Sequence, residues 1–177
     1  MKITAVDNTN RLFLVEDLLP QHLVDQILTT DWDSIAWKRG EMQEHWLRRH
    51  LENTDTLNQI NDFIHTIDFG IITGLPFTTW WYDEPKFNVP LHTDGHLPSA
   101  LQMFWIAESE DRGTVFYNSK NPADVRYHFQ FRPNTGYLML NHLDKDGSQP
   151  LQWHGMLTTT SKYRITSYTK LGECLVK

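Results

Sequence analysis

The chain contains 177 residues and carries a formal net charge of −6, because 22 Asp and Glu residues outnumber 16 Lys and Arg residues. This balance disfavours a nucleic-acid partner, since contact with the phosphate backbone needs a surplus of basic residues on at least one face. Hydrophobic residues make up 40% of the chain, enough for a core, and no stretch reaches the ~20 apolar residues of a membrane-spanning helix. We therefore expect a single domain over residues 1–177, with no nucleic-acid partner and no membrane association.

Cysteine content and the N-terminus bear on the cellular compartment. Cys174 is the only cysteine, so no internal disulfide can form, and a free thiol is typical of a reducing compartment. The first residues lack the apolar run of about 7–15 residues that a secretory signal needs. Together these features predict a cytoplasmic protein.

Two segments in the first half of the chain have the apolar spacing of amphipathic helices. The first spans residues 20–30 and has Pro20 in its first turn, where proline is tolerated. The second spans about 55–67, with Asn53 or Thr54 as its N-cap. These segments predict a helical N-terminal part over about residues 11–70.

From about residue 78 the apolar spacing changes to a period of two, with turn residues between short segments. The predicted strands are 78–83, 100–107, 113–118, 127–132, 137–141, 153–157 and 163–171. Helices followed by many short strands favour an α+β, mainly β, protein whose N-terminal helices pack on one face of a β core over about 78–171. Residues 32–51, with three tryptophans, fit either a lid or core packing.

His92 and Asp94 form the strongest local motif. Alternate residues of an extended segment point to the same side, so the imidazole and the carboxylate can converge on one point. His154, on a later predicted strand, could supply a third ligand. Two histidines and one carboxylate on one face of an octahedral metal leave three positions open, as in non-haem Fe(II) oxygenases. Taken alone, the His-x-Asp spacing also fits an exposed turn before Gly95.

Arg164 and Thr166 share one face of the predicted strand 163–171. A guanidinium beside a hydroxyl is a good receptor for a carboxylate. A buried arginine needs an anionic partner, and no acidic residue adjoins Arg164 in the sequence. A dicarboxylic ligand would meet that need, whereas an ordinary ion pair at a strand edge is the simpler alternative.

In the order and spacing of these motifs, the chain resembles the Fe(II)/2-oxoglutarate-dependent dioxygenases, and within them the prolyl-hydroxylase-like branch. The resemblance covers about residues 11–171. The motifs that carry it are His92-x-Asp94, His154 some sixty residues later, Arg164 ten residues beyond, and the Pro-x-x-Gly turn at Pro133–Gly136.

This resemblance implies a double-stranded β-helix, or jelly-roll, and a site for iron and its cosubstrate. The implied Fe(II) ligands are His92, Asp94 and His154. Arg164 and Thr166 would bind 2-oxoglutarate, and Tyr82, ten residues ahead of His92, matches a tyrosine that contacts the cosubstrate. The implied reaction uses O2 to hydroxylate a small molecule or a peptide side chain, such as a prolyl residue, and releases succinate and CO2.

The sequence leaves the substrate and the oligomeric state open. His96, Trp105 and Trp153 are candidates for a substrate pocket, although aromatic residues on strands mostly belong to the core. The chain departs from the family where Arg112-Gly113 replaces a glycine pair and Asn141 replaces an aromatic residue. A non-catalytic, cupin-like jelly-roll that binds metal or carbohydrate is the alternative function.

Overall fold

The computed structural model describes residues 1–7, 11–38, 48–51, 55–69, 76–94, 99–106, 113–140, 152–156 and 162–171. The strands in these ranges are β1 (Lys2–Asp7), β2 (Leu12–Glu16), β3 (Arg48–Leu51), β4 (Phe77–Asp83), β5 (Ala100–Ile106), β6 (Thr114–Tyr117), β7 (Val125–Phe129), β8 (Thr135–Met139), β9 (Trp153–Gly155) and β10 (Arg164–Lys170). The helices are α1 (Gln21–Thr29) and α2 (Asp55–Thr66).

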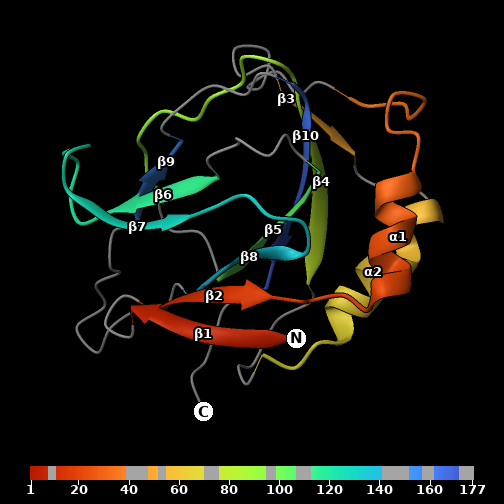
Figure 1. Ribbon diagram of the computed structural model, residues 1–177, viewed down its shortest axis with the longest axis horizontal. Coiled ribbons are helices and arrows are strands. Elements are labelled where there is room, and N and C mark those ends of the chain that lie inside the picture. Colours follow the sequence, from red (N-terminus) through yellow and green to blue (C-terminus); the bar gives the residue numbers. More distant parts are fainter. Residues whose placement is uncertain are drawn as a thin grey trace.

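The strands form two antiparallel sheets that face each other. The larger has the order β1-β2-β8-β5-β10-β4-β3, and the smaller has the order β7-β6-β9. Both helices cover the outer face of the larger sheet (Figure 1). This arrangement is the double-stranded β-helix with helices on one face, so the predicted fold class is confirmed. Each strand predicted from residue 78 onward is present, with its ends displaced by at most a few residues.

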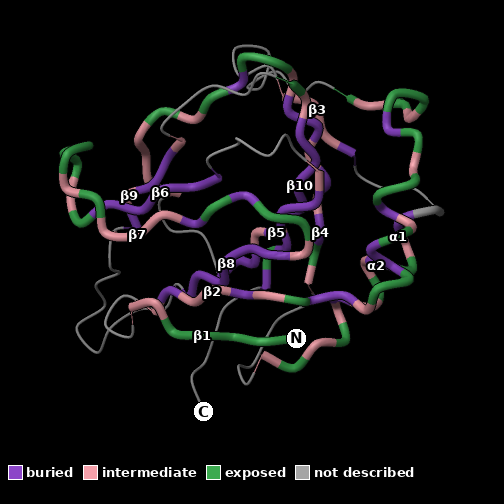
Figure 2. The backbone as a smooth tube through the Cα atoms, viewed as in Figure 1, coloured by how far each residue is buried: buried purple, intermediate pink, exposed green. Residues whose placement is uncertain are grey.

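The two helices form where the apolar spacing predicted them. α1 buries Leu23, Val24 and Ile27, and α2 buries Ile60 and Ile64, all in one cluster with the outer face of the larger sheet. Figure 2 shows this inward side of each helix as buried. The predicted caps of the second helix lie outside the described residues. Neither helix is long and apolar enough to cross a membrane.

Three strands were not predicted, and they lie at or beside the edges of the larger sheet. β1 is the outermost strand on one side and is mostly exposed (Figure 2), while β2 joins it to β8. β3 pairs with β4 at the opposite edge. Edge strands form through backbone hydrogen bonds and can keep polar side chains, so β1 and β3 lack a clear apolar alternation. The N-terminal part is therefore a mixture of strands and helices.

Trp32, Ile35 and Trp37 pack against the helix-covered face of the sheet. Trp32 is buried and stacks on Trp80 with ring centroids 5.7 Å apart, and Trp37 lies 6.0 Å from it on another side. This part of the 32–51 segment therefore serves core packing, while residues 39–47 lie outside the described ranges.

The two sheets enclose a second, largely aromatic cluster. Its buried members are Leu12, Phe104, Phe116, Phe129, Phe131, Tyr137 and Met139. Close pairing of β8 with β5 depends on Gly136, the glycine of the Pro-x-x-Gly turn, because a Cβ there would lie 1.9 Å from the Gln102 carbonyl oxygen. The aromatic cluster fills only part of the space between the sheets, and a cavity occupies another part.

Candidate metal centre

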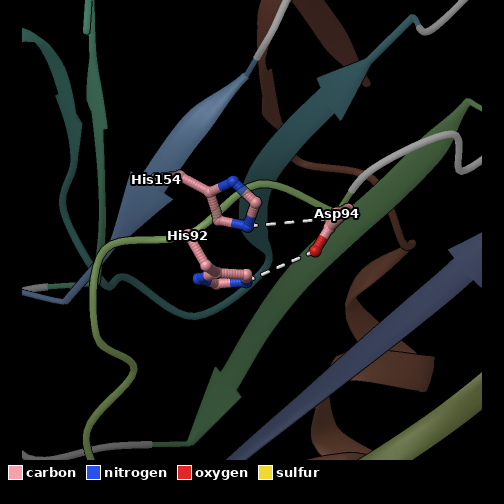
Figure 3. A group of neighbouring side chains, drawn as sticks. All are labelled: His92, Asp94 and His154. Carbon is pink, nitrogen blue, oxygen red and sulfur yellow. Dashed lines mark ion pairs between the residues drawn. The ribbon is translucent and has the colours of Figure 1, made fainter. Parts of the chain in front are cut away.

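The structure brings the three predicted metal ligands together. His92 and Asp94 lie on the segment between β4 and β5, and His154 lies on β9. The two Nε2 atoms point at the Asp94 carboxylate (Figure 3): that of His92 is 3.3 Å from Oδ1 and that of His154 is 3.6 Å from Oδ2. One donor atom from each residue falls within 4.8 Å of the others. This spacing suits a single bound ion.

Backbone hydrogen bonds hold the two histidines side by side. The N–H of His92 donates to the His154 carbonyl, and the N–H of His154 donates to the His92 carbonyl, both at 2.9 Å. Gly155 permits this approach, since a Cβ at that position would lie 2.8 Å from the Val89 carbonyl oxygen. The segment that carries His92 can therefore lie directly against β9.

The outer ring nitrogens fix the orientation of both imidazoles. His92 Nδ1 lies 2.9 Å from the Pro90 carbonyl oxygen, and His154 Nδ1 lies 2.8 Å from that of Gln152. A carbonyl accepts only, so each Nδ1 donates a proton to it and each Nε2 faces inward, where a neutral ring offers its lone pair to a metal. Two imidazoles and one carboxylate form a donor set that fits Fe(II).

The pKa values of the three side chains move in different directions. Burial lowers the pKa of His154 and outweighs the attraction of Asp94, so this imidazole is neutral. Burial also acts to lower the pKa of His92, but hydrogen bonds to Asp94 and the Pro90 carbonyl raise it above its ordinary value. Burial acts to raise the pKa of Asp94, and its contacts with both histidines reverse this. The Asp94 carboxyl group is therefore ionised, as a metal ligand needs to be.

The cluster opens into a cavity of about 630 Å³ that the larger sheet also lines. His92, Asp94, His154 and Arg164 all line it; His154 belongs to the smaller sheet and Arg164 to the larger one. The predicted metal ligands and the predicted carboxylate receptor thus share one space. A volume of this size is typical of small-ligand sites.

Arg164 has an anionic partner that is distant in the sequence. Its Nε donates to Asp83 Oδ2 at 2.6 Å, and the two residues lie opposite each other on β10 and β4. Asp83 also accepts two hydrogen bonds from Arg48, from Nε at 2.5 Å and from Nη2 at 3.1 Å. Burial acts to raise the pKa of Asp83, but the charges of Arg48 and Arg164 hold it below its ordinary value. One buried carboxylate therefore joins two guanidinium groups.

Two buried hydroxyls lie on the strand face that carries Arg164. Thr166 Oγ1 and the Tyr168 hydroxyl have no hydrogen-bond partner among the described residues, and Tyr168 lines the cavity. Burial raises the pKa of Tyr168, so its hydroxyl keeps its proton. Both hydroxyls could donate to a ligand with oxygen acceptors, such as a dicarboxylate. Of the two residues, only Tyr168 is among those that line the cavity.

Tyr82 and Trp105 do not lie in the cavity. Both side chains belong to the cluster beneath the helices: the Tyr82 hydroxyl donates to Asp33 at 3.1 Å, and Trp105 Nε1 donates to Ser167 Oγ at 2.9 Å. Side chains alternate along a strand, and on β4 it is Trp81, not Tyr82, that faces the cavity. The structure therefore does not bring Tyr82 and Trp105 to the metal centre.

The two remaining pocket candidates have different outcomes. Trp153 is half-buried, precedes His154 on β9 and is not among the residues that line the cavity. His96 lies outside the described residues. Arg48, Asp83 and Tyr168 were not predicted as site residues. The available signals were the basic run at residues 48–50 and an aspartate ending an apolar strand.

Comparisons with known proteins give a match in structure but not in sequence. No protein-family model and no curated protein matches the chain. A prolyl-4-hydroxylase from Pseudomonas putida superposes with a TM-score of 0.60 at 9% identity, covering 93% of this chain and 94% of that one. A viral collagen prolyl hydroxylase from Paramecium bursaria Chlorella virus-1, solved as its 2OG complex, gives 0.56 at 13% identity, with coverage of 93% and 97%.

A third match is a prolyl hydroxylase from Trichoplax adhaerens in complex with a peptide fragment of the hypoxia-inducible-factor oxygen degradation domain. Its TM-score is 0.57 at 8% identity, and the alignment covers 92% of this chain and 83% of that one. At such identities the likeness establishes the fold alone. The chain therefore has the fold of the prolyl hydroxylases, as the resemblance of its motifs predicted.

Proposed function

We propose that this protein is an Fe(II)- and 2-oxoglutarate-dependent dioxygenase that hydroxylates a small molecule or a peptide side chain and releases succinate and CO2. One observation carries the proposal: the His92, Asp94 and His154 cluster and the buried Arg164 line the same cavity. Metal binding alone would not require a guanidinium in the same cavity, whereas a dicarboxylate cosubstrate would.

In this proposal the histidines and Asp94 hold the metal on one face and leave three positions open. The carbonyls of Pro90 and Gln152 keep both Nε2 atoms turned toward it. When bound, the iron, 2-oxoglutarate and O2 supply the oxidising chemistry. The protein contributes the placement of the ligands and a cavity between two sheets.

Arg164 would pair with the far carboxylate of 2-oxoglutarate, with Thr166 as a second donor. Thr166 Oγ1 is buried without a partner among the described residues, and its side chain shares a strand face with Arg164. A buried hydroxyl without a partner costs about 1–3 kcal/mol, and a carboxylate oxygen would relieve that cost. Tyr168 lies four residues beyond Arg164 on β10. Its hydroxyl would therefore donate to a ligand group bound farther along that strand, toward Lys170.

The substrate would enter the part of the cavity that the cosubstrate leaves open. Trp81 and Phe104 give the cavity aromatic walls, which suit a residue-sized organic group. The peptide named in the Trichoplax adhaerens complex supports a peptide side chain, such as a prolyl residue, as one substrate class.

The test is an anaerobic titration of metal-free protein, first with Fe(II) and then with 2-oxoglutarate. The readout is the visible charge-transfer band of the chelated cosubstrate. The wild type should show the band, His92→Ala should lose it, and Arg164→Ala should weaken it. His22→Ala, at an exposed helix position, is the control and should behave as the wild type. Tight metal binding without a band would replace this proposal with the metal-binding module.

A further inference from the structure

We propose that Arg48 and Asp83 are positioning residues for the cosubstrate: Asp83 orients the Arg164 guanidinium, and Arg48 neutralises Asp83 so that the charge of Arg164 remains available to the far carboxylate. This inference rests on the proposed function and deepens it. It adds two residues, from β3 and β4, to a site that the sequence motifs assign to Arg164 and Thr166.

The hydrogen bonds place Asp83 between the two guanidinium groups. Asp83 is fully buried and engages Nε of Arg164 at 2.6 Å and both Nε and Nη2 of Arg48. A guanidinium is planar and rigid, so fixing its Nε edge also fixes the direction of its outer edge. Asp83 therefore sets the orientation of Arg164 within the cavity wall.

Aromatic rings hold the same two guanidinium groups from the side. The Phe87 ring lies 4.4 Å from the Arg48 guanidinium carbon and 5.3 Å from that of Arg164, and Trp81 lies 4.8 Å from that of Arg48. Phe87 is fully buried. The Phe87 ring thus contacts both guanidinium groups, and Asp83 hydrogen-bonds to both. The two arginine side chains are therefore held in a fixed relation to each other.

Arg48 affects a ligand bound by Arg164 because it changes the net charge of the ion group. Asp83 with Arg164 alone would form a neutral pair, and a neutral pair attracts a carboxylate weakly. Arg48 brings the group to a net charge of +1, and both arginines line the cavity. Because Asp83 and Arg164 are buried and Arg48 is only partly exposed, solvent screens this charge poorly and it acts strongly on a bound anion.

The experiment compares two ligands that differ only in the far carboxylate. Full-length protein loaded with Fe(II) is titrated anaerobically with 2-oxoglutarate and with 2-oxopentanoate, which has a methyl group in its place, and both Kd values are measured by calorimetry. Arg48→Gln should weaken 2-oxoglutarate binding by about tenfold and leave 2-oxopentanoate binding unchanged. The ratio of the two Kd values is the readout, since a purely structural role would weaken both ligands alike.

The double variant Arg48→Gln with Asp83→Asn separates charge from packing. It restores the net charge of +1, so it should regain most of the lost preference for 2-oxoglutarate. Arg48→Lys keeps the charge and should retain the preference. If Arg48→Gln does not fold, these two variants carry the test, and loss of the preference in both overturns the proposal.

Arg49→Gln is the matched control, because Arg49 is the next residue of β3 and pairs with Glu84 at 2.5 Å outside the cavity. It should keep the wild-type preference. An unchanged preference in Arg48→Gln, or an equal loss in Arg49→Gln, would overturn the role of Arg48. If wild-type protein binds neither 2-oxo acid, the proposed function itself fails.

Discussion

Gly155 shows how one missing side chain shapes the candidate metal centre. It follows His154 on β9, and the segment leading to His92 crosses directly over it. A Cβ at 155 would lie 2.8 Å from the Val89 carbonyl oxygen, a contact that backbone atoms do not tolerate without moving. The distance between His92 and His154 therefore depends on this glycine.

Gly155→Ala should consequently lower metal affinity while the fold persists. The added methyl group displaces the segment that carries His92, and ligand geometry determines affinity, so we expect a loss of about tenfold. Titration with Fe(II) under anaerobic conditions measures it, and circular dichroism checks the fold. Wild-type affinity in this variant would show that the segment can shift without disturbing the ligands.

Removing the Thr166 hydroxyl should raise the stability of the protein and weaken the binding of 2-oxoglutarate. The hydroxyl is buried without a partner among the described residues, so Thr166→Val should raise the free energy of unfolding by about 1 kcal/mol. The same change should weaken 2-oxoglutarate binding, because a donor to the carboxylate is lost. Urea denaturation and ligand titration measure the two effects.

Thr169 is the control for that substitution, because it lies on the same strand but its hydroxyl is 2.8 Å from that of Thr78. Thr169→Val should lower the free energy of unfolding and leave 2-oxoglutarate affinity unchanged. If Thr166→Val destabilised the protein as Thr169→Val does, Thr166 would have a structural partner rather than a ligand.

At the scale of elements, the Asp83 ion group joins three neighbouring strands. β3, β4 and β10 each contribute one member, and the contacts lie at one end of the larger sheet. Removing one member of a buried ion group leaves uncompensated charge and costs about 3–5 kcal/mol. Each member therefore depends on the other two, and the loss of one destabilises this edge of the sheet, where Arg48 and Arg164 also line the cavity.

Asp83→Asn should lower the free energy of unfolding by about that amount, and the loss should depend on pH. The folded-state pKa of Asp83 lies below its ordinary value of 3.8, so the ionised form is the one that folding favours. Its contribution is complete well above pH 3.8 and disappears as the pH falls through the folded-state pKa. Urea denaturation at pH 7 and pH 3 should show the gap between variant and wild type closing in acid.

At the scale of the whole molecule, the larger sheet separates the main hydrophobic core from the cavity. Its outer face carries the helices and the main core, and its inner face lines the cavity. Ile60 of α2 is fully buried on the outer side. A defect there should alter stability without reaching the ligands across the sheet.

Ile60→Ala should therefore lower the free energy of unfolding by about 2–5 kcal/mol and leave metal affinity unchanged in the folded protein. Thermal unfolding and metal titration test the two statements separately. Reduced metal affinity in a fully folded variant would contradict the separation of core and cavity.

Sequence patterns predicted the helices, the strands from residue 78 onward and the fold class, because burial of one face gives each element a period that can be read locally. They also selected His92, Asp94, His154 and Arg164, whose roles remain proposals. Polar edge strands such as β1 and β3 escaped prediction, since backbone pairing places few demands on their side chains.

Only the tertiary structure decided which side chains share the cavity. Arg48 meets Asp83 across 35 positions of the chain, and Asp83 meets Arg164 across 81; no local spacing encodes such contacts. Tyr82 had a suitable spacing from His92 but lies on the helix-covered face of β4. Local periodicity determines which residues of a strand share a side, whereas the packing of both sheets and the helices determines which side becomes core and which becomes cavity.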